Sequence, residues 1–293
     1  MTTADGTVLG TTKIVDSGPA ARRWNLVITG DGYTGAQMGQ FADDARSFAD
    51  TLLATPPFDS LRDAVNVHRV DVRSTGSGAA DPAECGGSGA APRTYFDASF
   101  CTNGVRRLLV VDDTTVLTLA GDQVPQWNMV IVAVNSTVYG GSGGSVAAYS
   151  LAPGANEIAL HEIGHTAFRL ADEYEYYRGC GVDTDRDRHP PLEPAQPNVT
   201  VDADRATNKW RDLVLPATPM PTTSNPDCSQ CDTRPSPVPA ATVGAFEGAH
   251  YHHCGAYRPQ FDCRMRALGH PFCAVCTEQI RRTLQPYLAA RED

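Results

Sequence analysis

The first half of the chain alternates short apolar runs with a stretch that has helical spacing. Short runs rich in β-branched residues and bounded by turn residues are typical of strands, and they predict strands at 26–30, 66–72, 107–111, 129–134 and 146–149. In segment 34–53 the apolar residues recur every three or four positions, which predicts an amphipathic helix. Strands that alternate with helices favour a mixed, mostly parallel sheet with helices packed on it.

The second half has fewer regular patterns. It is polar and rich in proline, and segments 180–200 and 215–242 are expected to be irregular loops. Helical spacing returns only near the end, at Ile280, Leu284 and Leu288, where it predicts a helix over 276–290.

These patterns together predict an α/β (α+β) fold in two parts. We expect an N-terminal subdomain over 1–170 and a loop-rich C-terminal subdomain over 171–293 that ends in the last helix.

One motif carries most of the candidate chemistry. His161-Glu162-Ile163-Gly164-His165 matches the H-E-x-x-H pattern of zinc hydrolases. Four helical residues turn the chain by about 400° and raise it by about 6 Å, so both imidazoles stand on one face and can chelate one ion. Glu162 can then take a proton from the attacking water without binding the metal. The motif therefore predicts a zinc site with Glu162 as general base.

The segments on either side of the motif define its helix. The turn at 153–156 and a candidate N-cap, Asn156, predict a helix start near residue 156. A catalytic zinc needs a third protein ligand, and Asp172 is the nearest candidate. On an unbroken helix Asp172 would lie about 16 Å along the axis from His161, so the helix must end near Arg169 or Leu170.

The identity of the third ligand stays open at this point. An error of one residue in the turn exchanges Asp172 and Glu173, and Asp172 could instead orient a ligand histidine by a hydrogen bond. Remote alternatives are Glu175, His250, His252 and His253.

Several separated segments resemble one family, the IgA-peptidase type of metallopeptidase, which is metzincin-like. The segments are NLVITGDGYT (25–34), HEIGHTAFRLADEYEYY (161–177), PNVTVDADRATNKWRDLV (197–214), GAFEGAHY (244–251) and YRPQFDCRMRALGHPFCAVC (257–276).

The resemblance implies a secreted zinc endopeptidase with a metzincin-like twisted mixed sheet. It implies Asp172 as the carboxylate ligand and Met265 as the residue of a methionine turn beneath the metal. Relatives often have glycine where this chain has Phe168 and Arg169, and glycine would help the chain to turn there. This departure leaves the choice between Asp172 and Glu173 open.

Composition excludes some partners. A net charge of −10 argues against nucleic acid, because phosphate binding needs a basic face. No apolar run approaches the roughly 20 residues that span a bilayer. The first ten residues do not have the pattern of a signal peptide, so for a secreted protein we expect that the signal has been removed. We expect a monomer that acts on a protein or peptide substrate.

Nine cysteines favour an oxidising compartment and disulfides. We expect Cys85 to pair with Cys101, and the cysteines around Met265 to form structural disulfides, with Cys263 bonded to one of the final pair. A structural zinc held by four thiolates is the alternative, because two pairs have zinc-ribbon spacing. The pairs with zinc-ribbon spacing are Cys228 with Cys231 and Cys273 with Cys276, and the cysteines around Met265 are Cys254, Cys263, Cys273 and Cys276.

The expected reaction is peptide hydrolysis. The phenol of Tyr251 or Tyr257 could donate a hydrogen bond to the oxyanion. The strand at 146–149 could pair with a peptide substrate along the cleft. A zinc amidase for a small substrate and an inactive binding protein of the same fold are the alternatives. Alternate carboxylates at Asp183, Asp185 and Asp187 suit a calcium ion, although the segment is no EF-hand.

Overall fold

The computed structural model describes residues 5–289, and the chain divides into two compact units. Unit 1 comprises Met1–Ala167 with Arg281–Asp293, and unit 2 comprises Phe168–Ile280. The segment from Arg281, expected in the C-terminal subdomain, groups with unit 1. The subdomain boundary expected at residue 170 stays a prediction.

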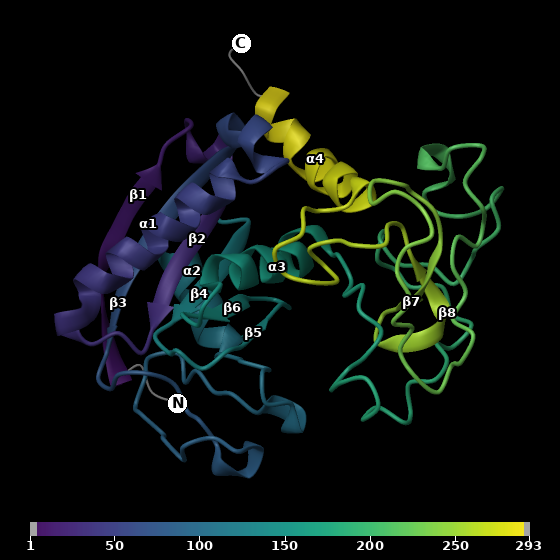
Figure 1. The fold of residues 1–293 in the computed structure, drawn as a ribbon. Helices are drawn as coiled ribbons and strands as arrows, with labels where there is room; N and C mark the ends of the chain where they lie inside the picture. The colour runs from purple at the N-terminus through teal and green to yellow at the C-terminus, as the bar shows by residue number, and fades with distance from the viewer. Residues whose placement is uncertain (1–4, 290–293) are drawn as a thin grey trace. The chain divides into compact units, whose positions relative to one another are not determined.

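Unit 1 contains a six-stranded mixed sheet with strand order β1-β3-β2-β4-β6-β5 (Figure 1). Strands β2, β3, β4 and β6 are parallel, whereas β1 and β5 pair antiparallel with their neighbours. The predicted mixed, mostly parallel sheet is therefore confirmed. The strands are β1 (Gly6–Val15), β2 (Trp24–Asp31), β3 (Val65–Ser74), β4 (Met129–Val134), β5 (Gly141–Ser142) and β6 (Ala147–Ser150).

Two details of the sheet differ from expectation. The prediction of a strand at 107–111 is wrong, because these residues form only isolated bridges, such as the one between Leu108 and Gly141. β1 was not predicted, although six of its ten residues are Val, Ile or Thr, because Gly10 interrupts its apolar pattern and the strand is partly exposed. The last strand before the zinc motif, β6, also has the short strand β5 on its outer side.

Four α-helices accompany the strands in residues 5–289. They are α1 (Met38–Ala54), α2 (Asp113–Gln123), α3 (Ala155–Phe168) and α4 (Ala274–Ala289). The helices expected at 34–53 and 276–290 correspond to α1 and α4 and are confirmed. Of the two, α1 lies along the sheet in Figure 1 and buries its apolar stripe, including Phe41 and Phe48.

The two faces of the sheet bury different side chains. Alternate strand residues such as Val27 and Val132 share a core with Val116 and Leu119 of α2, whose first turn is capped by Asp112. Helix α1 packs against β6 through Phe48 and Tyr149, whose ring centroids are 5.5 Å apart. The central strands are thus buried throughout, as expected for parallel strands.

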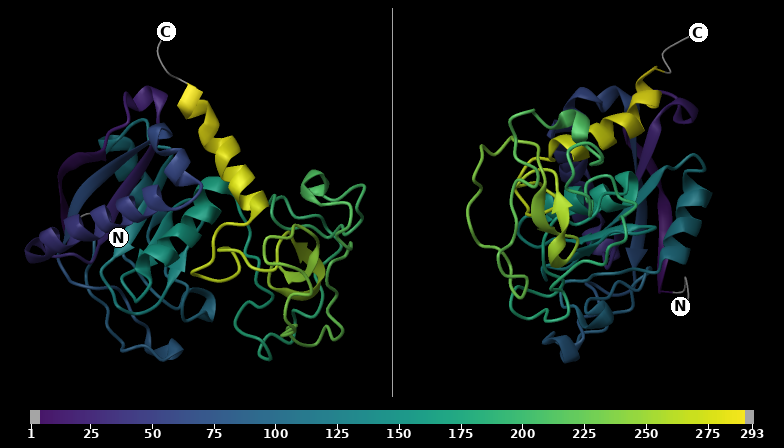
Figure 2. Two further views of the ribbon diagram at one scale, coloured as in Figure 1. Left: turned by 45° about the horizontal axis from the view of Figure 1, so that its top comes forward. Right: turned by 90° about the vertical axis from the view of Figure 1, so that its right-hand side faces the viewer.

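Unit 2 consists mostly of loops around one hairpin (Figure 2). The loops predicted at 180–200 and 215–242 are confirmed. The hairpin pairs β7 (Phe246–Ala249) with β8 (His252–Arg258). Its turn residues, His250 and Tyr251, both have positive φ, at 53° and 67°. Non-glycine residues adopt this conformation only where the surrounding structure imposes it.

The disulfide expectations are confirmed only in part. Cys85 is bonded to Cys101 as predicted. The prediction that Cys263 is bonded to Cys273 or Cys276 is wrong, because all three are buried free thiols. Two cross-links in unit 2 tie its loops together instead, Cys180–Cys231 and Cys228–Cys254. This pairing leaves no zinc-ribbon set of four thiolates.

Within residues 5–289, we find no helix with the length and apolarity that a membrane crossing requires.

Candidate active site

Helix α3 carries the zinc motif, and its ends lie close to where the sequence places them. It begins at Ala155, directly after Gly154 with φ of 85°, and ends at Phe168. The expected N-cap role of Asn156 is wrong, because this residue lies inside the helix and its amide bonds Ser47 of α1. Arg169 adopts a φ of 54°, so the chain turns here without the glycine expected of relatives.

The two motif histidines of unit 1 present their Nε2 atoms to one another at 3.1 Å. Two nitrogens bound tetrahedrally to one zinc, at about 2.0–2.1 Å each, lie about 3.3 Å apart. His161 is buried and His165 is half-buried. The side chains therefore fit two adjacent positions of one zinc ion.

The glycine-rich segment after β4 packs against the face of α3 that carries Glu162 and His165. Glu162 is 8% exposed, and a Cβ added to Gly141 would lie 2.7 Å from its Oε1. A Cβ on Gly143 would lie 2.4 Å from Cβ of His165. The glycines thus let the backbone lie directly against the general-base candidate and one candidate ligand.

Asp172, in unit 2, is 4% exposed and held by the β7–β8 turn. The Tyr251 hydroxyl donates to its Oδ2 at 2.5 Å, and the His250 backbone N–H donates to its carbonyl at 3.2 Å. A phenol that donates to a carboxylate fixes the carboxylate orientation. The turn therefore brings the hydroxyl of Tyr251 against the carboxylate of Asp172, and both residues are site candidates from the sequence.

The neighbouring carboxylate, Glu173, lies in a different environment. It is fully buried, and its Oε1 accepts from Nδ2 of Asn198 at 2.8 Å and lies near the thiols of Cys273 and Cys276. Its backbone N–H donates to the carbonyl of Met265 at 2.8 Å. Met265 is itself fully buried, and its role in a methionine turn stays a prediction.

The other sequence candidates have partners of their own in unit 2. Tyr257 lies in β8 opposite Glu247, and burial together with Glu247 raises the pKa of its phenol. Glu175 is ion-paired with Arg258 and Arg266.

The three remote histidines also have contacts within unit 2. Burial, with His189 and His252 nearby, lowers the pKa of His250 to about 4. His252 Nδ1 lies 2.6 Å from the carbonyl of His250, and His253 Nδ1 lies 2.9 Å from the carbonyl of Cys228.

The acidic loop organises its own backbone. Oδ2 of Asp183 accepts from the backbone N–H groups of Tyr177, Arg178 and Gly179, at 2.6 to 3.1 Å. Burial raises the pKa of Asp183, but these donors outweigh it and the net shift is downward. The side chain of Asp185 is 80% exposed. Asp183 therefore has a role that needs no cation, and the calcium site stays a prediction.

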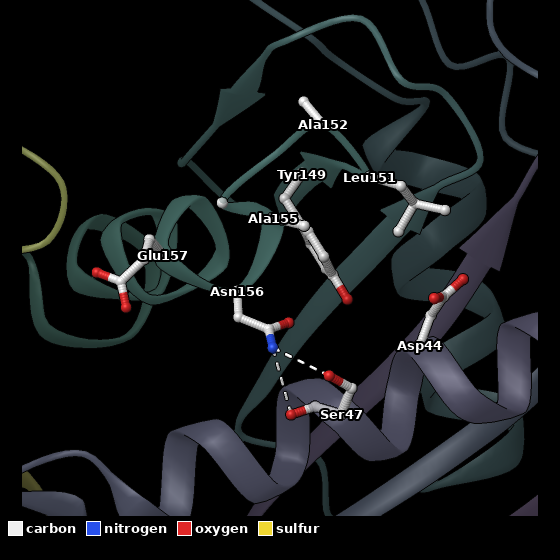
Figure 3. A pocket seen from close by; sticks show the side chains of 9 residues that line it. Asp44, Ser47, Tyr149, Leu151, Ala152, Ala155, Asn156 and Glu157 are labelled. Carbon is white, nitrogen blue, oxygen red and sulfur yellow. Dashed lines mark hydrogen bonds between the residues drawn. The ribbon is translucent and has the colours of Figure 1, made fainter.

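A cavity of about 330 Å³ opens in unit 1 at the start of α3 (Figure 3). Figure 3 shows Tyr149 reaching in between Asn156 and Asp44. Glu157 is the lining residue nearest in sequence to the zinc motif, and none of the motif residues lines the cavity. We therefore do not assign the reaction to this cavity.

A comparison with models of protein families shows to which family the chain belongs. The model described as IgA Peptidase M64 matches residues 12–234 and 233–284, which is nearly the whole chain. The chain belongs to the IgA peptidase M64 family. This is a metallopeptidase family, so membership supports a metallopeptidase function with a protein substrate. No curated protein matches the chain.

Sequence reasoning missed two features that the structure shows. Pairing of Tyr251 with Asp172 depends on a tight turn formed 79 residues away, which no local pattern encodes. The cluster of Glu173 with three thiols was also missed, although the closely spaced cysteines after Met265 were a visible signal. In both cases the residues were noticed and their partners were not.

Proposed function

We propose that this protein is a secreted zinc endopeptidase, in which His161 and His165 hold the catalytic zinc together with Asp172. The observation that carries the proposal is the 3.1 Å separation of the two histidine Nε2 atoms on a helix of an M64 family member. It is supported by the motif, which places a carboxylate between the two histidines.

The environments of the two adjacent carboxylates favour Asp172 over Glu173 as third ligand. Glu173 is enclosed by the thiols and by Asn198, which leaves Asp172 as the carboxylate near the end of α3 in sequence. A phenol bonded to Oδ2 of Asp172 resembles the outer partners that orient metal-binding carboxylates. Three protein ligands leave a fourth position open, as catalytic zinc requires.

The chain supplies the proton transfers of the reaction. Zinc, when bound, is a Lewis acid that polarises a carbonyl and makes water more acidic. Glu162 accepts a proton from the attacking water and later delivers it to the leaving amine. Its low exposure, beneath the backbone of Gly141, keeps bulk water from competing for that proton.

Two phenols remain candidates for stabilising the oxyanion. Tyr251 already donates to Asp172, so it reaches the oxyanion only if its hydroxyl turns from that carboxylate. Tyr257 lies in β8, where burial raises the pKa of its phenol and keeps it protonated as a donor. We propose that Tyr251 acts mainly by orienting Asp172.

The proposed compartment rests on the cysteines. Three disulfides are present in the described residues, and disulfides persist in oxidising surroundings. We propose that the protein works outside the cell, as a monomer.

Replacement of Glu162 by Gln tests the proposal. The amide keeps the shape but cannot take the proton, so zinc content should equal that of the wild type while hydrolysis of a peptide library falls about 100-fold or more. Glu157→Gln, on the first turn of the same helix, is the matched control and should keep full activity. Removal of metal by a chelator should abolish cleavage, and zinc should restore it. Near wild-type cleavage by zinc-loaded Glu162→Gln protein would exclude the mechanism, and cleavage of small amides alone would exclude an endopeptidase.

A further inference from the structure

We propose that unit 2 holds a second, structural zinc ion, bound by Cys263, Cys273, Cys276 and Glu173. All four residues belong to unit 2 and are buried. One ligand atom from each lies within 4.8 Å of each of the others. This site differs from the catalytic one in its residues and its ligand chemistry, and its existence does not depend on the proposed function.

The distances between the ligand atoms match a zinc tetrahedron. With zinc-to-sulfur bonds of about 2.3 Å, two thiolates on one ion lie about 3.8 Å apart, and a thiolate and a carboxylate oxygen lie about 3.5 Å apart. The Sγ atoms of Cys263 and Cys276 are 3.8 Å apart. Oε1 of Glu173 lies 3.6 Å from Sγ of Cys273 and 3.4 Å from Sγ of Cys276.

Backbone donors point at the sulfurs as they do at thiolates. Sγ of Cys263 accepts from the N–H groups of Met265, at 3.4 Å, and of Cys273, at 3.3 Å. Sγ of Cys273 accepts from the N–H of Cys276 at 3.4 Å. Backbone N–H groups bond a metal-bound thiolate more strongly than a neutral thiol, so this arrangement suits sulfur that binds a metal.

Glu173 provides an independent observation. Its Oε2 is buried and has no hydrogen-bond partner among the described residues. A buried acid beside three thiols is costly unless a cation compensates it. A divalent ion at the centre of the four groups provides that compensation.

Chemistry favours zinc over a disulfide at this cluster. The other six cysteines are paired, whereas these three are not, and three thiols could form only one disulfide and leave one thiol over. Thiolate-rich tetrahedral sites select zinc, and four protein ligands leave no open position, which is typical of structural zinc.

The proposed ion would brace the segment next to the catalytic ligand. Glu173 directly follows Asp172, and its N–H bonds the carbonyl of Met265, two residues after Cys263. One ion would therefore fix the chain on both sides of that contact. The ion would add to the two disulfides of unit 2, which contains one two-stranded sheet and long loops.

The test is to count zinc in protein that lacks the catalytic ligands. We expect about two zinc ions per chain in the wild type and about one in His161→Ala/His165→Ala. X-ray absorption at the zinc edge of that double variant should show about three sulfurs at 2.3 Å and one oxygen at 2.0 Å. Its three free thiols should resist alkylation until the protein is denatured or the metal is chelated.

Cys273→Ser/Cys276→Ser should lose the second zinc and keep the ion at His161 and His165. If this variant does not fold, the absorption and alkylation results on the histidine variant still decide the question. Three outcomes would overturn the proposal: a folded histidine variant without zinc, a disulfide among the three cysteines in the intact mass, or a bound metal without sulfur ligands. Failure of the catalytic site alone would leave the wild type with one sulfur-bound zinc.

Discussion

Replacing Gly143 by Ala should disturb the candidate zinc site through one added methyl group. The new Cβ would lie 2.4 Å from Cβ of His165, whereas carbon atoms in contact prefer about 3.5–4.0 Å. Cβ of His165 is fixed by its helix and cannot rotate away. The clash must therefore shift either the helix or the glycine-rich segment.

The segment has little freedom to absorb this shift. Gly141 pairs with Tyr149 in the sheet, and the N–H of Gly144 donates to Oγ1 of Thr166 at 3.1 Å. Overpacking of this kind costs about 1–3 kcal/mol. If the strain is relieved by displacing His165 from its metal-binding position, zinc affinity falls about 5- to 150-fold, since 1.4 kcal/mol is a factor of ten.

Gly144→Ala is the matched control, because a Cβ at that position meets no atom nearer than 4.0 Å. Neither glycine has a positive φ in the range that disfavours alanine, so the two variants differ only in the clash. Gly144→Ala should leave stability unchanged or raise it by about 0.4–1 kcal/mol. Zinc affinity measured by chelator competition and unfolding by urea check both variants. Equal zinc affinity and equal stability in the two would refute the packing argument.

Two further substitutions test the contacts of unit 2. Tyr251→Phe removes the donor to Asp172 and should lower kcat/KM about 10- to 100-fold, because a hydrogen bond to a charged group contributes about 1.5–3 kcal/mol. Steady-state peptide hydrolysis checks this, and a larger loss for Tyr257→Phe would reverse the roles of the two phenols. Asp183→Asn should lower the free energy of unfolding by about 1–2 kcal/mol at pH 7, since its carboxylate accepts three backbone bonds. Because its pKa is lowered in the folded protein, this contribution is fully present above the unfolded value of about 4 and is lost progressively as the pH falls from there through the lowered folded pKa. Urea titrations should show a smaller difference at pH 3 than at pH 7, and Asp185→Asn, at an 80% exposed side chain, should show none at either pH.

The buried strands were predictable because both of their faces lie in the apolar core, which requires a continuous run of apolar residues. β4 coincides with the expected strand at 129–134, since a strand buried on both faces is continuously apolar. Segment 107–111 has a similar run, yet its backbone finds only isolated bridges. β1 is rich in β-branched residues, yet Gly10 interrupts it and only its pairing with the edge of β3 makes it a strand. Pairing partners, and not local propensity, decide such cases.

The candidate site also contains residues that could be predicted from the sequence and residues that could not. His161, Glu162 and His165 were predictable because one helix fixes their spacing. The partners of the cysteines in unit 2 were not predictable, because each depends on loops that the sequence does not position, whereas Cys85 and Cys101, only 16 residues apart, were paired correctly.

Diffraction at the zinc absorption edge, from crystals grown with zinc, tests the catalytic metal site most directly. We predict an anomalous peak about 2.0–2.1 Å from Nε2 of His161 and of His165, and about 2.0–2.2 Å from a carboxylate oxygen of Asp172. A peak with both Asp172 oxygens more than about 3 Å away would contradict the proposed ligand set. The absence of any peak at the two histidines would contradict the zinc peptidase itself.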